Sequence, residues 1–304
     1  MDLGYDGRLY ILAFDHRGSF QKKFFGVQGD PTPDEAARIS DAKQVIFEGM
    51  LAVLEKDPDP VLREAAGILV DEQFGAPIVR DAKKRRLMFA MPVEKSGQNE
   101  FDFQYGDEFD AHILDYDPTF SKVLVRFNPE GNGEMNARQA VKLKQLGDWL
   151  HANGKKYLFE LLVPAETHQL ETVGDDDGRY DRELRPDLML TAISQLQQAG
   201  IEPDIWKIEG LDRREDCERI SEQCRTGGRD GVACVVLGRG ADDSAVDNWL
   251  KRAAGVPGYV GFAIGRSIWW DPLKAYVDGE IERAAAADKI SHNYLRFVSV
   301  YKAG

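Results

Sequence analysis

The sequence is poor in cysteine and in long hydrophobic runs. Its three cysteines, Cys217, Cys224 and Cys234, are odd in number and show no CxxC spacing. This pattern excludes a disulfide framework and predicts reduced structural thiols. No apolar run approaches the roughly 18 residues of a membrane span, and "MDLGYDGRLY" at the N-terminus lacks the basic flank and apolar core of a signal peptide. We therefore expect a cytoplasmic protein without a membrane partner.

Basic residues are outnumbered, because Lys and Arg total 39 against 52 Asp and Glu, for a net charge of −13. This balance argues against a nucleic-acid-binding surface, so we expect no nucleic-acid partner. Any anionic substrate must then be bound by a local basic pocket. Histidine is scarce as well: His112, His151, His168 and His292 show no metal-binding spacing, so we expect surface residues and no metal site.

Short β-rich runs alternate with longer amphipathic runs along the whole chain, which is typical of parallel βαβ units. Eight strands are predicted at 9–15, 66–71, 86–92, 122–127, 156–163, 204–210, 232–238 and 259–265. Helices are predicted at 34–56, 136–153, 187–199, 212–225, 242–253 and 268–287, with a closing helix in the tail at 291–304. A short link is expected between the second and third strands, and a long polar segment at 94–120. The pattern predicts a TIM (β/α)8 barrel, an α/β fold, as a single domain over 1–304.

The alternation of side chains along each strand separates those that face the barrel interior from those that face the helices. In the strand at 204–210, Trp206 and Ile208 should face the helices, which puts Lys207 and Glu209 inside. The same reasoning places four further polar side chains inside: Asp15, Lys122, Arg126 and Glu160. Charged groups are costly in a barrel interior, so they indicate chemistry; the alternative is a neutralised network of buried salt bridges.

The inward lysines suggest the chemistry. A desolvated lysine near a second cation, here Lys207 near Lys122, is expected to have a lowered pKa and to attack a carbonyl group as a neutral amine, giving a Schiff base. Glu160 is then a candidate general acid and base for carbon–carbon bond cleavage. Asp15 would bind substrate hydroxyls or orient Lys207.

A family resemblance covers almost the whole chain. The segments "LAFDHRGSF", "GILVDEQFG", "PVEKSG", "SKVLVRF", "LFELLV", "DIWKIEG" and "AIGRSIW" resemble, in the same order, the class I aldolases that cleave tagatose 1,6-bisphosphate and sulfofructose 1-phosphate. The resemblance is closest to the aldolase-like proteins of myo-inositol catabolism, which act on 2-deoxy-5-keto-gluconate 6-phosphate or occur fused behind a sugar kinase. It implies Lys207 as the Schiff-base residue, Lys122 as its partner and Glu160 as the proton-transfer group. It also implies a phosphorylated sugar or sugar-acid substrate, no cofactor and a homo-oligomer.

Two residues depart from the sugar-bisphosphate enzymes of this family. His16 stands where they usually have glutamine, and Arg126 where they more often have a neutral side chain. An additional inward arginine suits a substrate carboxylate, which it binds through two hydrogen bonds. We therefore expect 2-deoxy-5-keto-gluconate 6-phosphate as the substrate, with Arg126 or Lys95 at its carboxylate. The alternatives are that Arg126 neutralises Glu160 or Asp71 and that Lys95 is a solvated loop residue.

Phosphate is commonly bound by the loops after the last two strands of a TIM barrel. "VVLGRGADD" and "AIGRSIWWDP" lie there, so Gly238, Arg239, Gly265 and Arg266 are candidate phosphate-binding residues. The resemblance favours Arg266 over Arg239. Glycine-rich turns that only close the barrel are the alternative.

The remaining candidate substrate-binding residues are His16, Arg17, Asp71 and Glu209. For Asp71, together with Glu72, capping of the next segment is an equally good interpretation. Two other functions stay open. The first is a metal-dependent barrel lyase with Asp15, His16, Asp71 and Glu160 as ligands and Lys207 as base, and the second is a non-catalytic sugar-phosphate-binding barrel. Within the aldolases, tagatose 1,6-bisphosphate and sulfofructose 1-phosphate remain alternative substrates.

Overall fold

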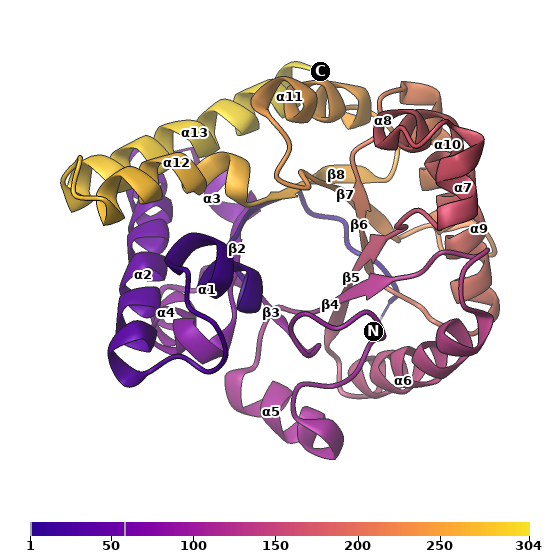
Figure 1. The fold of residues 1–304 in the computed structure, drawn as a ribbon, viewed down its shortest axis with the longest axis horizontal. Coiled ribbons are helices and arrows are strands. Elements are labelled where there is room, and N and C mark those ends of the chain that lie inside the picture. The colour runs from indigo at the N-terminus through magenta and orange to yellow at the C-terminus, as the bar shows by residue number, and fades with distance from the viewer. Residues whose placement is uncertain (1, 58) are drawn as a thin grey trace.

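Eight parallel strands close into a barrel in the computed structural model, which describes residues 2–57 and 59–304 (Figure 1). Each strand pairs with the next in the sequence, and β1 pairs with β8 to close the barrel. The strands are β1 Leu9–Ala13, β2 Ala66–Leu69, β3 Met88–Pro92, β4 Phe120–Arg126, β5 Lys156–Leu162, β6 Ile205–Glu209, β7 Ala233–Leu237 and β8 Tyr259–Ile264. The predicted TIM barrel is confirmed.

Helices surround the barrel and cover its outer face (Figure 1). They are α1 Gly18–Phe25, α2 Pro33–Lys56, α3 Pro60–Ala65, α4 Glu72–Arg85, η1 Gly106–Glu108, α5 Phe109–Tyr116, α6 Gly133–Ala152, α7 Thr167–Thr172, α8 Asp177–Arg179, η2 Tyr180–Leu184, α9 Arg185–Gln198, α10 Arg214–Arg225, α11 Asp243–Ala253, α12 Arg266–Val277 and α13 Arg283–Ala303. Local sequence explains where α2 begins: Thr32 and Glu35 form a capping box, and Pro33 occupies the first turn, where a missing N–H costs nothing. None of these helices is both long and apolar enough to span a bilayer.

Two predictions about the helices are wrong. The link between β2 and β3 is not short, because it contains α4, a helix of 14 residues. Pro77 lies inside α4. Because proline usually interrupts a helix, this residue made the helix hard to predict from the sequence. The predicted helix at 268–287 is in fact two helices, α12 and α13, with Gly279 in the left-handed conformation between them.

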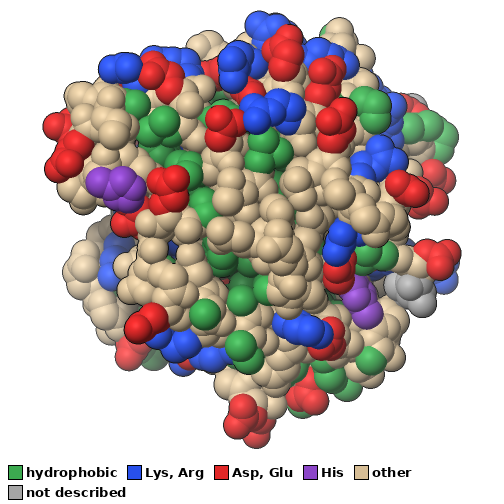
Figure 2. Space-filling model, turned by 90° about the vertical axis from the view of Figure 1, so that its right-hand side faces the viewer, with side chains coloured by type: hydrophobic (Ala, Val, Ile, Leu, Met, Phe, Trp, Pro, Cys, Tyr) green, Lys and Arg blue, Asp and Glu red, His purple; other side chains and the backbone are tan. Residues whose placement is uncertain are grey.

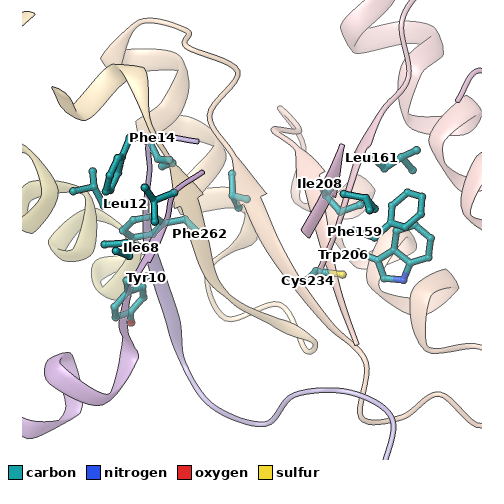
Figure 3. Close-up of a cluster of buried hydrophobic side chains, with 14 of the residues drawn as sticks. Tyr10, Leu12, Phe14, Ile68, Phe159, Leu161, Trp206, Ile208, Cys234 and Phe262 are labelled. Carbon is teal, nitrogen blue, oxygen red and sulfur yellow. The ribbon is translucent and has the colours of Figure 1, made fainter. Parts of the chain in front are cut away.

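The predicted division of side chains between the two faces of the barrel is confirmed. Figure 3 shows Tyr10, Leu12 and Phe14 of the first strand segment, and Trp206 and Ile208 of β6, in the apolar layer between barrel and helices. A second apolar layer lies inside the barrel: Leu9, Ile11, Ala13, Leu69, Ala90, Phe120, Leu158, Ile205, Ala233, Val235 and Ala263. Polar interior side chains therefore lie above this layer, toward the carboxyl ends of the strands.

The outer surface is strongly charged. On the face shown in Figure 2, acidic and basic side chains lie interspersed, and hydrophobic side chains are scattered among them. This distribution fits a chain with 30% charged residues. The concentration of charge that needs a functional explanation is inside the barrel.

Candidate active site

A cavity of about 590 Å³ opens at the carboxyl ends of the strands. Its walls include nearly all the site residues that the sequence predicts: Asp15, His16, Arg17, Lys95, Lys122, Arg126, Glu160, Lys207, Glu209, Gly238, Arg239, Gly265 and Arg266. The barrel brings them together because parallel strands present all their carboxyl ends on one face. Asp71 is the exception.

Two buried lysines share one carboxylate at the floor of this cavity. The Nζ atoms of Lys207 and Lys122 each lie 3.0 Å from Oε2 of Glu160. Their side chains are only 3% and 2% exposed. Strand register explains the first contact, because Glu160 of β5 lies directly beside Lys207 of β6. The structure thus places an amine next to a group that can accept its proton.

Lys122 has two further carboxylate partners, Asp15 at 2.8 Å and Glu94 at 2.9 Å. Burial opposes its charge, but the three carboxylates outweigh burial and raise the pKa of Lys122 well above its usual value. This differs from the expectation that Lys122 acts on Lys207 as an unneutralised cation. It also places Asp15 on Lys122, so the arrangement gives no direct contact by which Asp15 would orient Lys207.

The three carboxyl groups differ in protonation. Burial favours the neutral form of all three, but Lys122 and Lys207 reverse its effect and lower the pKa values of Asp15 and Glu160. For Glu94, burial prevails over Lys122 and Arg17, and its pKa is raised. Asp15 and Glu160 are therefore ionised at neutral pH, whereas Glu94 is the carboxyl group most inclined to hold a proton.

Sequence reasoning missed Glu94, although a signal was present. Phe89 and Val93 face the helices, so alternation along the strand places Glu94 inside. The prediction chose its neighbour Lys95 instead. The Lys95 side chain is 39% exposed at the mouth of the cavity, where its amine bonds Asp102 at 2.8 Å.

His16 is neutral in this setting. Burial lowers its pKa to about 4, with Asp15 opposing this effect and Arg266 reinforcing it. The imidazole packs edge-on against Trp269, at 5.6 Å between ring centroids, and its buried Nδ1 has no hydrogen-bond partner. A neutral imidazole at the cavity wall can bind a substrate hydroxyl without adding charge.

The two arginines near the predicted phosphate site differ in availability. Arg239 is paired with Asp181 at 2.6 Å and with Glu209 at 3.1 Å. Arg266, in the first turn of α12, has no carboxylate partner among the described residues, and it donates a hydrogen bond to the Arg239 carbonyl. Arg266 is therefore the better candidate for an anionic ligand.

Two glycines lie where these loops meet, and their neighbours differ. A Cβ atom at Gly240 would lie 2.4 Å from Cζ of Arg266, and one at Gly265 would lie 2.3 Å from the Ala13 carbonyl oxygen. Gly265 is thus needed for the close approach of β8 to β1, as the closing-turn alternative holds. Gly240, with φ +71°, leaves room for the Arg266 guanidinium.

The other candidate substrate residues have different settings. Glu209 is 4% exposed, accepts a hydrogen bond from the Val163 amide and faces two arginines, so it anchors the end of β6. Arg17 donates to the Glu94 carbonyl at 2.6 Å and is also buried. Arg126 donates to the Gln98 carbonyl and forms no ion pair within 2–57 and 59–304, so it neutralises neither Glu160 nor Asp71.

Asp71 lies outside the cavity and has a structural role. It is completely buried, accepts a hydrogen bond from the Phe74 amide as the cap of α4, and pairs with the buried ammonium of Lys43. The capping interpretation is confirmed. Over the part of the chain that the structure describes, no group of three His, Cys, Asp or Glu side chains is arranged to hold a metal ion.

Replacing Asp71 by alanine should destabilise the fold by about 3–5 kcal/mol, because the buried Lys43 amine loses its carboxylate partner and α4 loses its cap. Urea unfolding measures the free energy. The control is Asp288→Ala, which breaks the exposed pair with Lys56 and should cost less than about 1 kcal/mol. Equal stability losses in both variants, with a raised KM only for Asp71→Ala, would instead place Asp71 in substrate binding.

His112 also differs from its predicted surface position. Its side chain is 12% exposed, stacks on Tyr105 and lies 3.4 Å from Glu72. Glu72 accepts a hydrogen bond from the Tyr105 hydroxyl at 2.7 Å. These contacts connect the segment before β4 to α4. They hold the Glu72 carboxylate away from the cavity, whose lining does not include this residue.

The fold and the charged interior define a TIM barrel with a polar cavity at the carboxyl ends of its strands. A family profile described as "Uncharacterized protein conserved in bacteria (DUF2090)" matches residues 5–304. The chain belongs to this family. No curated protein matches its sequence.

Solved structures of aldolases have a similar fold. A fructose-bisphosphate aldolase from Plasmodium falciparum, in complex with TRAP and a small-molecule inhibitor, superposes with a TM-score of 0.66 at 14% identity, over 97% of this chain and 91% of that one. An archaeal fructose 1,6-bisphosphate aldolase gives 0.58 at 12% identity, over 98% and 95%. A Schiff base forming fructose-1,6-bisphosphate aldolase gives 0.56 at 10% identity, over 97% and 94%. At these identities the likeness shows the fold alone.

Proposed function

We propose that this protein is a class I aldolase that cleaves a phosphorylated keto sugar or keto sugar acid through a Schiff base on Lys207. The observation that carries the proposal is the buried Lys207 amine, 3.0 Å from Glu160, at the floor of a cavity with basic groups on its walls. The aldolases among the similar structures support it. Borohydride reduction in the presence of dihydroxyacetone phosphate, followed by mapping of the modified peptide, tests it.

Schiff-base formation follows from the Lys207–Glu160 contact. Glu160 accepts a proton from the Lys207 ammonium, and the free amine attacks the ketone carbon of the substrate. The attacking nitrogen loses a proton, which passes to the carbonyl oxygen and makes it a hydroxyl, and Glu160 returns its proton as this hydroxyl leaves as water. The product is an iminium ion, whose positive charge withdraws electrons from the adjacent carbon.

Carbon–carbon cleavage uses the same carboxylate. Glu160 removes the proton from the hydroxyl on the carbon two positions from the iminium carbon. The bond between that carbon and the carbon next to the iminium carbon then breaks, and its electrons form an enamine. An aldehyde leaves. Protonation of the enamine and hydrolysis of the iminium then release the ketone product and restore Lys207. In this scheme Lys122 donates a hydrogen bond to a reacting substrate oxygen.

The cavity offers positive charge at opposite sides. Arg266 follows β8 and Arg126 ends β4, and these strands lie across the barrel from each other because three strands separate them on either side. This placement suits a substrate with an anion at each end. We therefore favour 2-deoxy-5-keto-gluconate 6-phosphate, which cleaves to dihydroxyacetone phosphate and malonate semialdehyde, with Arg266 at the phosphate and Arg126 at the carboxylate.

Replacing Arg126 by alanine should lower kcat/KM for the keto acid phosphate by roughly 10- to 150-fold, the effect of losing one charge-assisted hydrogen bond. A neutral ketose monophosphate should be affected much less. Arg252→Ala, at an exposed position in α11, is the control. Equal losses for both substrates would show that Arg126 does not bind the carboxylate.

A side-by-side assay decides the substrate. The purified enzyme would be given the keto-gluconate phosphate, tagatose 1,6-bisphosphate and sulfofructose 1-phosphate at equal concentrations. We expect the highest kcat/KM for the first. A clear preference for either of the others would reject this substrate and leave the aldol chemistry intact.

A further inference from the structure

The ammonium group of Lys122 donates hydrogen bonds to Asp15 and Glu94 and forms an ion pair with a third carboxylate, Glu160. A lysine ammonium has three N–H groups and no acceptor. Three carboxylate groups surround it, those of Asp15 at 2.8 Å, Glu94 at 2.9 Å and Glu160 at 3.0 Å. Lys122 can therefore donate to a bound substrate only if one of these partners gives way.

Glu94 is the carboxylate partner of Lys122 whose pKa burial raises despite the nearby positive charges. Asp15 and Glu160 are the two carboxylates whose ionised forms the lysines favour. Glu94 has Oε1 toward Lys122 and Arg17, at 2.9 and 3.6 Å, while its buried Oε2 has no hydrogen-bond partner. A proton on Glu94 must therefore reside on Oε2, since Oε1 already accepts from an ammonium.

The backbone fixes Glu94 in this position. Residue 94 forms an isolated antiparallel bridge with Phe103, and its carbonyl accepts a hydrogen bond from Arg17. The side chain is 9% exposed, so it has little freedom to turn away. A change in the Lys122–Glu94 contact is thus more readily made by protonation than by movement of Glu94.

We infer that Glu94 is a positioning residue for Lys122, and that the proton on Glu94 decides whether Lys122 is held on this carboxyl group or released to a bound substrate. The inference rests on the proposed aldolase function. Ionised Glu94 holds the Lys122 ammonium by opposite charge as well as by a hydrogen bond, whereas the neutral acid offers the hydrogen bond alone. Ionised Glu94 therefore retains the third N–H of Lys122, and neutral Glu94 allows it to move to a substrate oxygen.

The surroundings of Glu94 define the direction of the pH effect. Burial acts most strongly and raises its pKa, Lys122 of β4 and Arg17 after β1 lower it, and Asp15 raises it. From β5, Tyr157 has a hydroxyl whose own pKa burial and Glu94 both raise, so it stays neutral. Rising pH ionises Glu94 and should retain Lys122, so activity should fall on the alkaline side of the raised pKa.

The test is the pH profile of Glu94→Gln. Glutamine keeps an oxygen for Lys122 but is neutral at every pH. Wild-type turnover should decline by about tenfold for each pH unit above the pKa of Glu94, as for one ionisation. Glu94→Gln should lose this decline and keep the rate of the low-pH wild type. Glu64→Gln, an exposed position in α3, should behave as wild type.

Two further measurements separate the possible failures. An infrared difference spectrum between wild type and Glu94→Gln, recorded at a pH below the alkaline decline, should contain the carbonyl band of a protonated carboxylic acid. Absence of this band, or an unchanged alkaline decline in Glu94→Gln, overturns the inference while a borohydride adduct on Lys207 still supports the aldolase. No adduct in the wild type overturns both. If Glu94→Gln does not fold, Glu94→Asp should shift the alkaline decline, and an unshifted decline rejects the inference.

Discussion

Lys207→Met should reduce aldol cleavage by roughly 10,000-fold or more, the scale of loss when a catalytic nucleophile is removed. The wild type, treated with borohydride and dihydroxyacetone phosphate, should lose activity and gain the mass of the reduced adduct on the peptide that contains Lys207. Methionine keeps the length and apolar body of the lysine, so the variant should fold, which circular dichroism and the urea midpoint can verify.

Lys95→Met is the control for labelling of another lysine in the same cavity. Its adduct should still form on Lys207, because Lys95 lies at the mouth and is paired with Asp102. Activity that persists in Lys207→Met, or that is lost with EDTA alone, would contradict a class I mechanism. Loss with EDTA would favour the metal-dependent alternative.

Glu160→Gln should slow turnover by roughly 100-fold or more, the usual contribution of general acid–base catalysis. The amide keeps the shape of the carboxylate but neither accepts the Lys207 proton nor removes one from a substrate hydroxyl. An adduct on Lys207 should still accumulate during long incubation with borohydride. Slow turnover with a retained adduct therefore distinguishes loss of proton transfer from loss of the nucleophile.

The pH dependence gives an independent check on Glu160. Burial opposes its ionisation, but Lys122 and Lys207 prevail and lower its pKa. Activity that needs ionised Glu160 should therefore persist into mildly acidic solution and fall only below the ordinary range for glutamate. A near-wild-type rate in Glu160→Gln would remove Glu160 from the mechanism, whatever the profile.

Much of the fold could be predicted from the sequence because the signals are local. Hydrophobic runs and alternation within each strand depend on neighbours two residues apart, and they placed Lys207, Lys122 and Glu160 on the inner face correctly. Where the local signal misleads, the prediction failed, as at α4, where Pro77 conceals a helix. Tertiary packing stabilises α4, since Phe74, Ile78 and Val79 are buried in the outer core.

Asp71 illustrates a question that local signals leave open. A carboxylate at the end of a barrel strand suits both a site residue and a helix cap, since either position follows the strand directly. The decision comes from α2, which brings Lys43 to Asp71 from 28 residues away in the chain. Only the packing of that helix determines which way the carboxylate faces.

The sequence by itself determined the barrel, the inward set of charges and the amine at the centre, because strand periodicity and polarity depend only on residues that are neighbours in the chain. The tertiary structure decided how those charges pair. Asp15, Glu94 and Glu160 come from three different strand ends and meet on one ammonium, that of Lys122. Their protonation depends on distance and burial, which exist only once the barrel has closed.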